Sequence, residues 1–310
     1  MKKLLKFLLT LIIIGGVIAG AFYYVGNKYH DEIYLYYRDN ILKVKENIKL
    51  DKNEYYKKQN YSYVKNTNDF VAKDKKHLLN IFYTVINSGT TNFTFFCDEK
   101  YEKCISDVES LVENKDTLSH INNFVHPYNS FENIGVSYDN YGEIHVKVEK
   151  VYSQADIEKL NNKIDTIIKN KIKSNMTTKQ KIETIHDYII NNSRYAKDSL
   201  RKKNPNKSYS KADDVLIDGY GLCGAYSDAM ALFLYKFKVD NYKIASDIHV
   251  WNLVKVNNKW LHLDLTWDDP ITQDGSDKLQ KLFMLIDNKE LKNLKVEKHN
   301  YNKVIYKEAA

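Results

Sequence analysis

The chain contains a cysteine placed to act as a nucleophile. Cys223 follows the run Asp218-Gly-Tyr-Gly-Leu and precedes an apolar stretch typical of a helix. In the first turn of a helix, unpaired backbone N–H groups and the positive end of the helix dipole stabilise a thiolate. Thiolate is the reactive form, so this position favours covalent catalysis through Cys223. The alternative interpretation is a small buried hydrophobe, the usual role of a lone cysteine.

An imidazole and a carboxylate follow Cys223 along the chain, in the order Cys, His, Asp. His249 begins the run His-Val-Trp-Asn, and Asp264 begins the run Asp-Leu-Thr-Trp-Asp-Asp-Pro. A thiol nucleophile needs a base, and the base needs a partner that orients it. We therefore predict a catalytic set of Cys223, His249 and Asp264.

The pattern around Asn257 and Asn258 predicts how His249 and Asp264 are brought together. The stretches 249–256 and 259–266 alternate, and Asn accepts the positive φ that a two-residue hairpin turn requires. With these two residues as the loop, Val256 faces Lys259 and His249 faces Thr266. His249 and Asp264 are then diagonal neighbours on one face, roughly 7 Å apart. The other face is apolar, with Val250, Val254, Val256, Leu261, Leu263 and Leu265. A one-residue slip in the loop would break this pairing.

Neighbouring side chains offer competing interpretations. Asp268 and Asp269 are alternative carboxylates, but they precede Pro270 in a stretch typical of a turn. His262 lies on the same predicted face, and we interpret it as a packed histidine. The three tryptophans are interpreted as core packing rather than as the walls of a cleft, and they are Trp251, Trp260 and Trp267.

A metal site is the remaining alternative for these groups. Cys223, His249, His262 and Asp264 are all possible zinc ligands, but no Cys-x-x-Cys or His-Glu-x-x-His spacing accompanies them. We predict neither a metal nor another cofactor. The second donor of an oxyanion hole stays unidentified, the first being the backbone N–H of Cys223.

The three blocks Gly-Leu-Cys-Gly-Ala-Tyr-Ser, His-Val-Trp-Asn and Asp-Leu-Thr-Trp-Asp-Asp-Pro resemble the signatures of the transglutaminase-like superfamily, within the papain-like group of cysteine enzymes. The resemblance spans roughly residues 175–290 and departs mildly at Val250, where members more often have alanine. It implies an α+β fold with the nucleophile helix packed on an antiparallel sheet. It also implies that Cys223 is the nucleophile, His249 the general base and acid, and Asp264 the orienting carboxylate. The superfamily includes amide cross-linkers, peptidases, deamidases and members without catalysis, so the resemblance leaves the reaction open.

The N-terminus predicts where this chemistry takes place. Residues 7–25 form an uncharged apolar run that is long enough to cross a bilayer, and Lys2, Lys3 and Lys6 precede it. By the positive-inside rule, the N-terminus is cytoplasmic and the body lies outside the cell membrane. We favour an uncleaved single-pass anchor; cleavage near Ala19-Gly-Ala21 would instead give a secreted protein.

The remainder has the composition of a globular body. Of the 310 residues, 43% are hydrophobic and 13% aromatic, which is ample for a core. The formal net charge is +7, but the lysines are scattered, and no pattern for binding nucleic acid is present. Abundant Lys, Asn, Ile and Tyr with only 3 Pro are typical of an AT-rich bacterial genome.

We predict four regions along the chain. Residues 1–25 are the anchor or signal segment, 26–75 a stalk or linker, 76–152 a small α+β subdomain, and 153–310 the transglutaminase-like catalytic domain. Thr177 and Gln180 match a helix capping box. We expect helices over 34–49, 78–86, 106–112, 155–172 and 182–190, a strand over 92–97, a hairpin of 135–138 with 143–151, and an exposed loop over 202–211.

Cys97 and Cys104 leave two possibilities. Outside the cell they can pair across a short loop and leave Cys223 as the free thiol, or both can stay unpaired.

Two classes of function follow. The favoured one is an extracytoplasmic cysteine enzyme that acts on amide bonds of a surface protein or wall peptide through a thioester on Cys223, by hydrolysis or acyl transfer. The alternative is a non-catalytic scaffold or binding module with the same fold at the cell surface.

Overall fold

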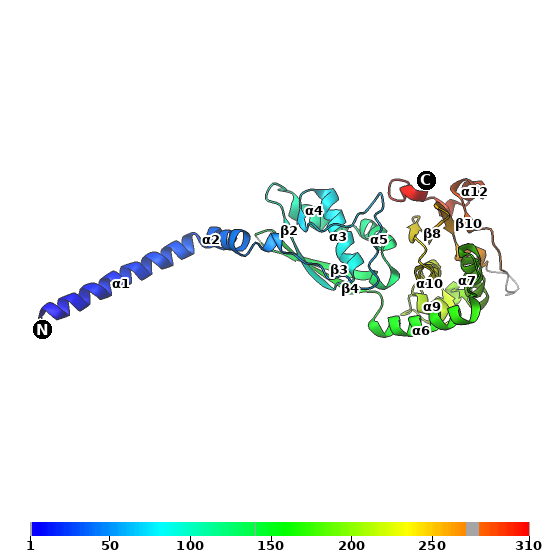
Figure 1. Ribbon diagram of the computed structural model, residues 1–310, viewed down its shortest axis with the longest axis horizontal. Coiled ribbons are helices and arrows are strands. Elements are labelled where there is room, and N and C mark those ends of the chain that lie inside the picture. The colour runs from blue at the N-terminus through cyan, green and yellow to red at the C-terminus, as the bar shows by residue number, and fades with distance from the viewer. Residues whose placement is uncertain (1, 140, 271–278, 310) are drawn as a thin grey trace.

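A single long helix precedes the folded body. The computed structural model describes residues 2–139, 141–270 and 279–309, and α1 (Lys2–Lys28) projects away from the rest of the chain (Figure 1). Its part Leu9–Lys28 is long and apolar enough to cross a membrane and is not buried by other residues. Three short helices then lead to the body, namely α2 (His30–Tyr36), the π-helix η1 (Tyr37–Ile41) and η2 (Val44–Glu46).

The first part of the body is a four-stranded sheet covered by helices. The strand order is β1-β2-β4-β3, where β2 (Asn92–Cys97) pairs in parallel with β1 (Val71–Ala72) and antiparallel with β4 (Glu143–Lys150), and β3 (Phe131–Tyr138) completes the hairpin. Its helices are α3 (Lys75–Ser88), α4 (Cys104–Glu113), α5 (Lys115–Phe124) and the 3₁₀ turn η3 (Pro127–Asn129). The strand and hairpin lie where the sequence predicts them, whereas α5 carries too few apolar residues to be predicted.

The second half of the predicted stalk packs into this body. Tyr61, Val64 and Phe70 are buried in the core that also contains α3. In addition, Lys57 Nζ donates to the carbonyl oxygen of Asn241 at 2.5 Å, far along the sequence. Only the first part of residues 26–75 therefore separates α1 from the core.

Two long helices and several short elements lie between the first sheet and Cys223. α6 (Gln154–Lys171) and α7 (Thr178–Asn192) begin at capping boxes, and the Thr177 and Gln180 box is the one predicted from sequence. Short elements then form the approach to Cys223, namely β5 (Arg194–Tyr195), α8 (Asp198–Lys203), α9 (Ala212–Leu216) and β6 (Tyr220–Gly221). α8 falls partly in the predicted loop over 202–211.

A second sheet carries the predicted hairpin. Its order is β10-β9-β8-β7, formed by β7 (Asn241–Ala245), β8 (Val250–Val256), β9 (Lys259–Leu263) and β10 (Met284–Ile286). Helix α10 (Cys223–Lys236) shares a buried cluster with Val254, Val256 and Leu263. The chain continues through α11 (Leu265–Asp268), α12 (Asn288–Asn293), η4 (Glu297–His299) and η5 (Lys307–Ala309).

Both faces of this second sheet are covered. Side chains on the face opposite α10, such as Tyr242, Trp251 and Leu253, share a core with the first sheet and with Tyr306 of the C-terminal segment. One core therefore contains residues from both of the regions predicted as 76–152 and 153–310; that division itself stays a prediction.

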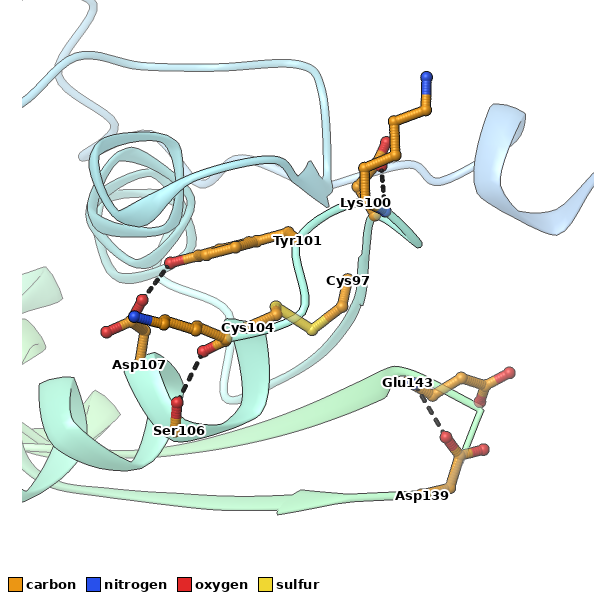
Figure 2. Close-up of a disulfide and its surroundings, with 10 residues drawn as sticks. Cys97, Lys100, Tyr101, Cys104, Ser106, Asp107, Asp139 and Glu143 are labelled. Atoms are coloured by element: carbon orange, nitrogen blue, oxygen red, sulfur yellow. Dashed lines mark hydrogen bonds between the residues drawn. A yellow bond between two sulfur atoms is a disulfide. The ribbon is translucent and has the colours of Figure 1, made fainter.

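A disulfide fastens the end of β2 to the start of α4. Cys97 and Cys104 are bonded, with their Cα atoms 5.9 Å apart (Figure 2). Beside it, Tyr101 donates to Asp107 at 2.6 Å across the same turn. Of the two possibilities left by the sequence, the structure has the paired one, and Cys223 is the free cysteine.

Candidate active site

The turn before Cys223 depends on two glycines. Gly219 adopts φ +78°, a left-handed conformation that glycine accommodates without strain. At Gly221, a Cβ atom would lie 2.4 Å from Val215 Cγ2 and 2.7 Å from Ala225 Cβ, so α9 and α10 approach the backbone too closely for any side chain. Cys223 is then the first residue of α10, as predicted, and its thiol is half-buried.

The hairpin has the predicted register. Val256 faces Lys259 and Leu253 faces His262, while Asn257 and Asn258 have φ values of 50° and 62°. These two positive φ values are those of a type I′ turn, which explains why Asn occupies both positions.

The predicted second strand ends earlier than expected, at Leu263 rather than at residue 266. Asp264 is the N-cap of α11, and its Oδ1 accepts from the backbone N–H groups of Thr266 at 2.9 Å and Trp267 at 3.3 Å. These bonds turn the chain into a helix. Leu265 is still buried beneath α10, but as part of α11.

The structure brings His249 and Asp264 into direct contact. His249 Nε2 lies 2.5 Å from Asp264 Oδ2, and both side chains are buried. Because Nε2 faces the carboxylate, Nδ1 is the ring nitrogen left for Cys223. A hydrogen bond between the His249 ring and the Cys223 thiol is one cause of the shifted pKa values of both groups.

The electrostatics of the three groups favour a thiolate beside an imidazolium. Burial raises the pKa of Cys223, but the hydrogen bond and charge of His249 outweigh burial. The pKa of the thiol therefore lies below its ordinary value. Burial lowers the pKa of His249, but hydrogen bonds to Asp264 and Cys223 raise it to about 9. Burial also raises the pKa of Asp264, and the bonds from His249 and His299 lower it to about 2.

Polar contacts fasten α10 to β8 and so fix the distance between Cys223 and His249. Ser227 Oγ lies 2.8 Å from the Cys223 carbonyl oxygen and 3.0 Å from that of Val250. Asn252, the last residue of the His-Val-Trp-Asn run, donates from Nδ2 to the Ser227 carbonyl oxygen at 2.9 Å. The asparagine of this motif therefore holds the strand against the helix.

The competing carboxylates lie elsewhere. Asp268 is fully buried and lies 3.1 Å from His186 Nε2 of α7 while accepting from the backbone of Phe283. Asp269 accepts from the hydroxyl of Tyr226. Asp268 therefore ties α11 to α7, and Asp269, the C-cap residue of α11, bonds to α10.

His262 and the tryptophans pack around the site. His262 Nδ1 accepts from Trp251 Nε1 at 3.0 Å, and burial lowers the pKa of His262 to about 4. Trp251 stacks on the His249 ring with 5.6 Å between ring centres, and Trp267 meets the same ring edge-on. Trp260 lies against Tyr242, with 5.1 Å between ring centres.

Sequence reasoning missed one residue. His299, the last residue of η4, places Nε2 2.8 Å from the same Asp264 oxygen that His249 contacts. Ligand atoms of His249, Asp264 and His299 lie within 4.8 Å of one another, and this set differs from the four residues considered as zinc ligands above. Hydrogen bonds from both rings to one oxygen account for the cluster. No spacing links His299 to the motifs, so no signal in the sequence identified it.

Comparisons with solved structures give weak similarities. A crystal structure described as that of a TGase has 14% sequence identity, covers 44% of this chain and 44% of its own length, and has a TM-score of 0.33. A structure described as "a Putative Cysteine Protease from Cytophaga hutchinsonii" also has 14% identity, with 48% of this chain and 65% of that chain covered and a TM-score of 0.28. The chain thus spans less than two thirds of either protein.

The family comparison is specific to one segment. A search of curated proteins finds no match. Residues 165–265 match the family model of the transglutaminase-like superfamily, and this segment contains Cys223, His249 and Asp264. The match covers about a third of the chain, and it is similarity to this superfamily over that segment.

Proposed function

We propose that this protein is a membrane-anchored cysteine enzyme that cleaves or exchanges amide bonds of a surface protein or wall peptide outside the cell. The observation that carries the proposal is the arrangement of His249 between Cys223 and Asp264, at the N-terminus of α10. Geometry and charge together favour a thiolate held beside a protonated imidazole.

In the proposed reaction, the Cys223 thiolate attacks the carbonyl carbon of an amide. The carbonyl oxygen becomes negative, and the backbone N–H of Cys223, which has no helical carbonyl partner at the first position of α10, is a donor for it. His249 then gives its proton to the amide nitrogen. The C–N bond breaks, the amine leaves, and a thioester remains on Cys223.

The second half of the reaction decides the outcome. If water attacks the thioester, His249 takes its proton, and the products are a carboxylic acid and the restored thiol. If an amine attacks, the product is a new amide. Both routes use the same three residues, so the acceptor decides between hydrolysis and cross-linking.

Two features support action outside the cell. The lysines before the apolar segment favour a cytoplasmic N-terminus, and the body that follows contains the Cys97–Cys104 disulfide. Disulfides persist mainly in oxidising compartments. The lysines before the apolar segment and the disulfide therefore both support a body that lies outside the cell membrane.

The first experiment uses the full chain in detergent and measures the alkylation rate of Cys223 by iodoacetamide at neutral pH. Cys223 is the free cysteine, so the label reports a single site. We expect the folded protein to react faster than the same chain in urea without reductant, although folding buries the thiol. Slower reaction of the folded chain would contradict an enzyme and favour a non-catalytic scaffold.

The second experiment identifies the reaction. The full chain and its Cys223→Ala variant are incubated with a glutamine-containing peptide library and a labelled primary amine, and the products are analysed by mass spectrometry. New peptide termini or the conversion of side-chain amides to acids indicate hydrolysis, and addition of the amine indicates acyl transfer. Products formed equally by the Cys223→Ala variant would contradict the proposed thioester.

A further inference from the structure

His299 reaches the site from a part of the chain outside the family match. It lies in the C-terminal segment after α12, whereas the match ends at residue 265. Its Nε2 is 2.8 Å from Asp264 Oδ2, and His249 Nε2 is 2.5 Å from the same oxygen. A carboxylate oxygen only accepts, so Nε2 of His299 is its protonated nitrogen.

Packing alone does not explain a histidine at this position. The ring stacks on Phe283 at 4.9 Å with 12° between the ring planes, and it meets Trp251 at 4.8 Å and Trp267 at 5.4 Å. Within the described residues, its buried Nδ1 has no hydrogen-bond partner. A phenylalanine would fill this aromatic surrounding without burying an unpaired nitrogen. The polar contact that distinguishes the histidine is the one to Asp264.

The segment that carries His299 is fixed at its far end. The Tyr306 hydroxyl accepts from Asn123 Nδ2 at 2.7 Å and lies 2.7 Å from His120 Nδ1, both on α5. Glu308 accepts from the backbone of Ser62 at 2.7 Å. The segment that carries His299 is therefore anchored to the first part of the body as well as packed on the second sheet.

We propose that His299 is a positioning residue that holds the Asp264 carboxylate in line with His249. This inference rests on the proposed function. Asp264 Oδ1 is fixed by two backbone N–H groups, and Oδ2 is held between the two rings. With the carboxylate immobilised, the His249 ring keeps Nδ1 directed at Cys223.

Other titratable groups act on Asp264 without holding it. Cys223, Tyr195 and His262 each feel its charge through space. In the described residues, the side chains bonded to the carboxylate are those of His249 and His299. His262 is thus a matched control, since it is a second buried histidine near the same charge but bonds Trp251 instead.

The experiment compares three full-length variants in detergent, measuring the pH profile of Cys223 alkylation and the melting temperature. His299→Phe keeps the ring packing and removes the donor, His299→Gln keeps a donor and removes the ring, and His262→Phe is the control. We expect His299→Phe to lower the rate at neutral pH by about 10- to 100-fold, the usual effect of losing a hydrogen bond to a charged group, with no fall in melting temperature. The midpoint of its profile should move to higher pH. His299→Gln should recover part of the rate, and His262→Phe should keep the wild-type midpoint.

The results decide between a positioning and a structural role. A wild-type rate and midpoint in His299→Phe would overturn the proposal, as would a melting temperature that falls together with the rate. An equal shift of the midpoint in His262→Phe would assign the effect to the aromatic packing and would also overturn it. If wild-type Cys223 itself is not activated, the proposed function fails instead, so the two failures are distinguishable.

Discussion

At the scale of single residues, burial and mutual contacts have opposite effects on the pKa values of the site. Burial disfavours a charged form of Cys223, His249 and Asp264 alike, and their mutual contacts reverse each shift. The arrangement works because each group has a defined partner, with His249 Nε2 on Asp264 and Nδ1 left for the sulfur. Removing His249 would leave burial as the largest remaining effect on the pKa of Cys223.

This balance predicts the pH dependence of Cys223 alkylation. The pKa of the thiol is lowered and that of His249 is raised to about 9, so the thiolate should form below the ordinary thiol range and keep its imidazolium partner until the pH approaches 9. In His249→Ala, burial remains without the ion pair, so the midpoint should rise above the ordinary value. We expect the rate at neutral pH to fall by at least about tenfold, which corresponds to one pKa unit. Iodoacetamide kinetics across a pH series measure this, and an unchanged midpoint would contradict the ion pair.

At the scale of elements, the sequence predicted the features that depend on residues close together in the chain. The hairpin register followed from Asn257 and Asn258, because a two-residue turn fixes which side chains face each other. The position of Cys223 at a helix start followed from the glycines before it. The short helix after Asp264 was missed, because strand alternation continues through Leu265 while the capping bonds of Asp264 turn the backbone.

Contacts between residues far apart in the sequence could not be predicted from local patterns. His299 meets Asp264 because Tyr306 and Glu308 fasten the C-terminal segment to the first part of the body. Likewise, Tyr61 and Phe70 are buried in the core, although the polar composition of residues 26–75 predicts a stalk or linker. Such contacts depend on the packing of distant elements and leave no periodic pattern in one sequence.

The turn before the nucleophile gives a prediction at this scale. In Gly221→Ala, the new Cβ would overlap Val215 and Ala225, displacing the first turn of α10. We expect the free energy of unfolding to fall by about 1–3 kcal/mol, the usual effect of overpacking, and Cys223 alkylation to slow. Gly135→Ala is the control, because nothing lies within 4 Å of a Cβ atom at that strand position. Urea unfolding of both variants measures the difference, and equal stability would show that α10 tolerates the shift.

At the scale of the whole molecule, the chain consists of one exposed helix and a folded body that contains the candidate site (Figure 1). α1 projects from the body, and the other described residues leave its apolar part Leu9–Lys28 unburied (Figure 1). The body binds its own C-terminal segment and holds Cys223, His249 and Asp264 at the junction of α10 with the second sheet. A membrane anchor separated from the site by a folded body would leave Cys223 accessible to substrates at the cell surface.

The orientation of the chain can be tested with its own disulfide. If the lysines before the apolar run set the topology, replacing Lys2, Lys3 and Lys6 by glutamate should leave a fraction of the chains with the body in the cytoplasm. The reducing cytoplasm would keep Cys97 and Cys104 of those chains as thiols. We expect the oxidised fraction, measured by gel shift after trapping free thiols with a maleimide polymer, to fall relative to wild type. Glutamate at the exposed Lys169, Lys173 and Lys179 changes the net charge equally and should leave it unchanged. Full oxidation in both variants would show that these three lysines do not determine the side of the membrane on which Cys223 lies.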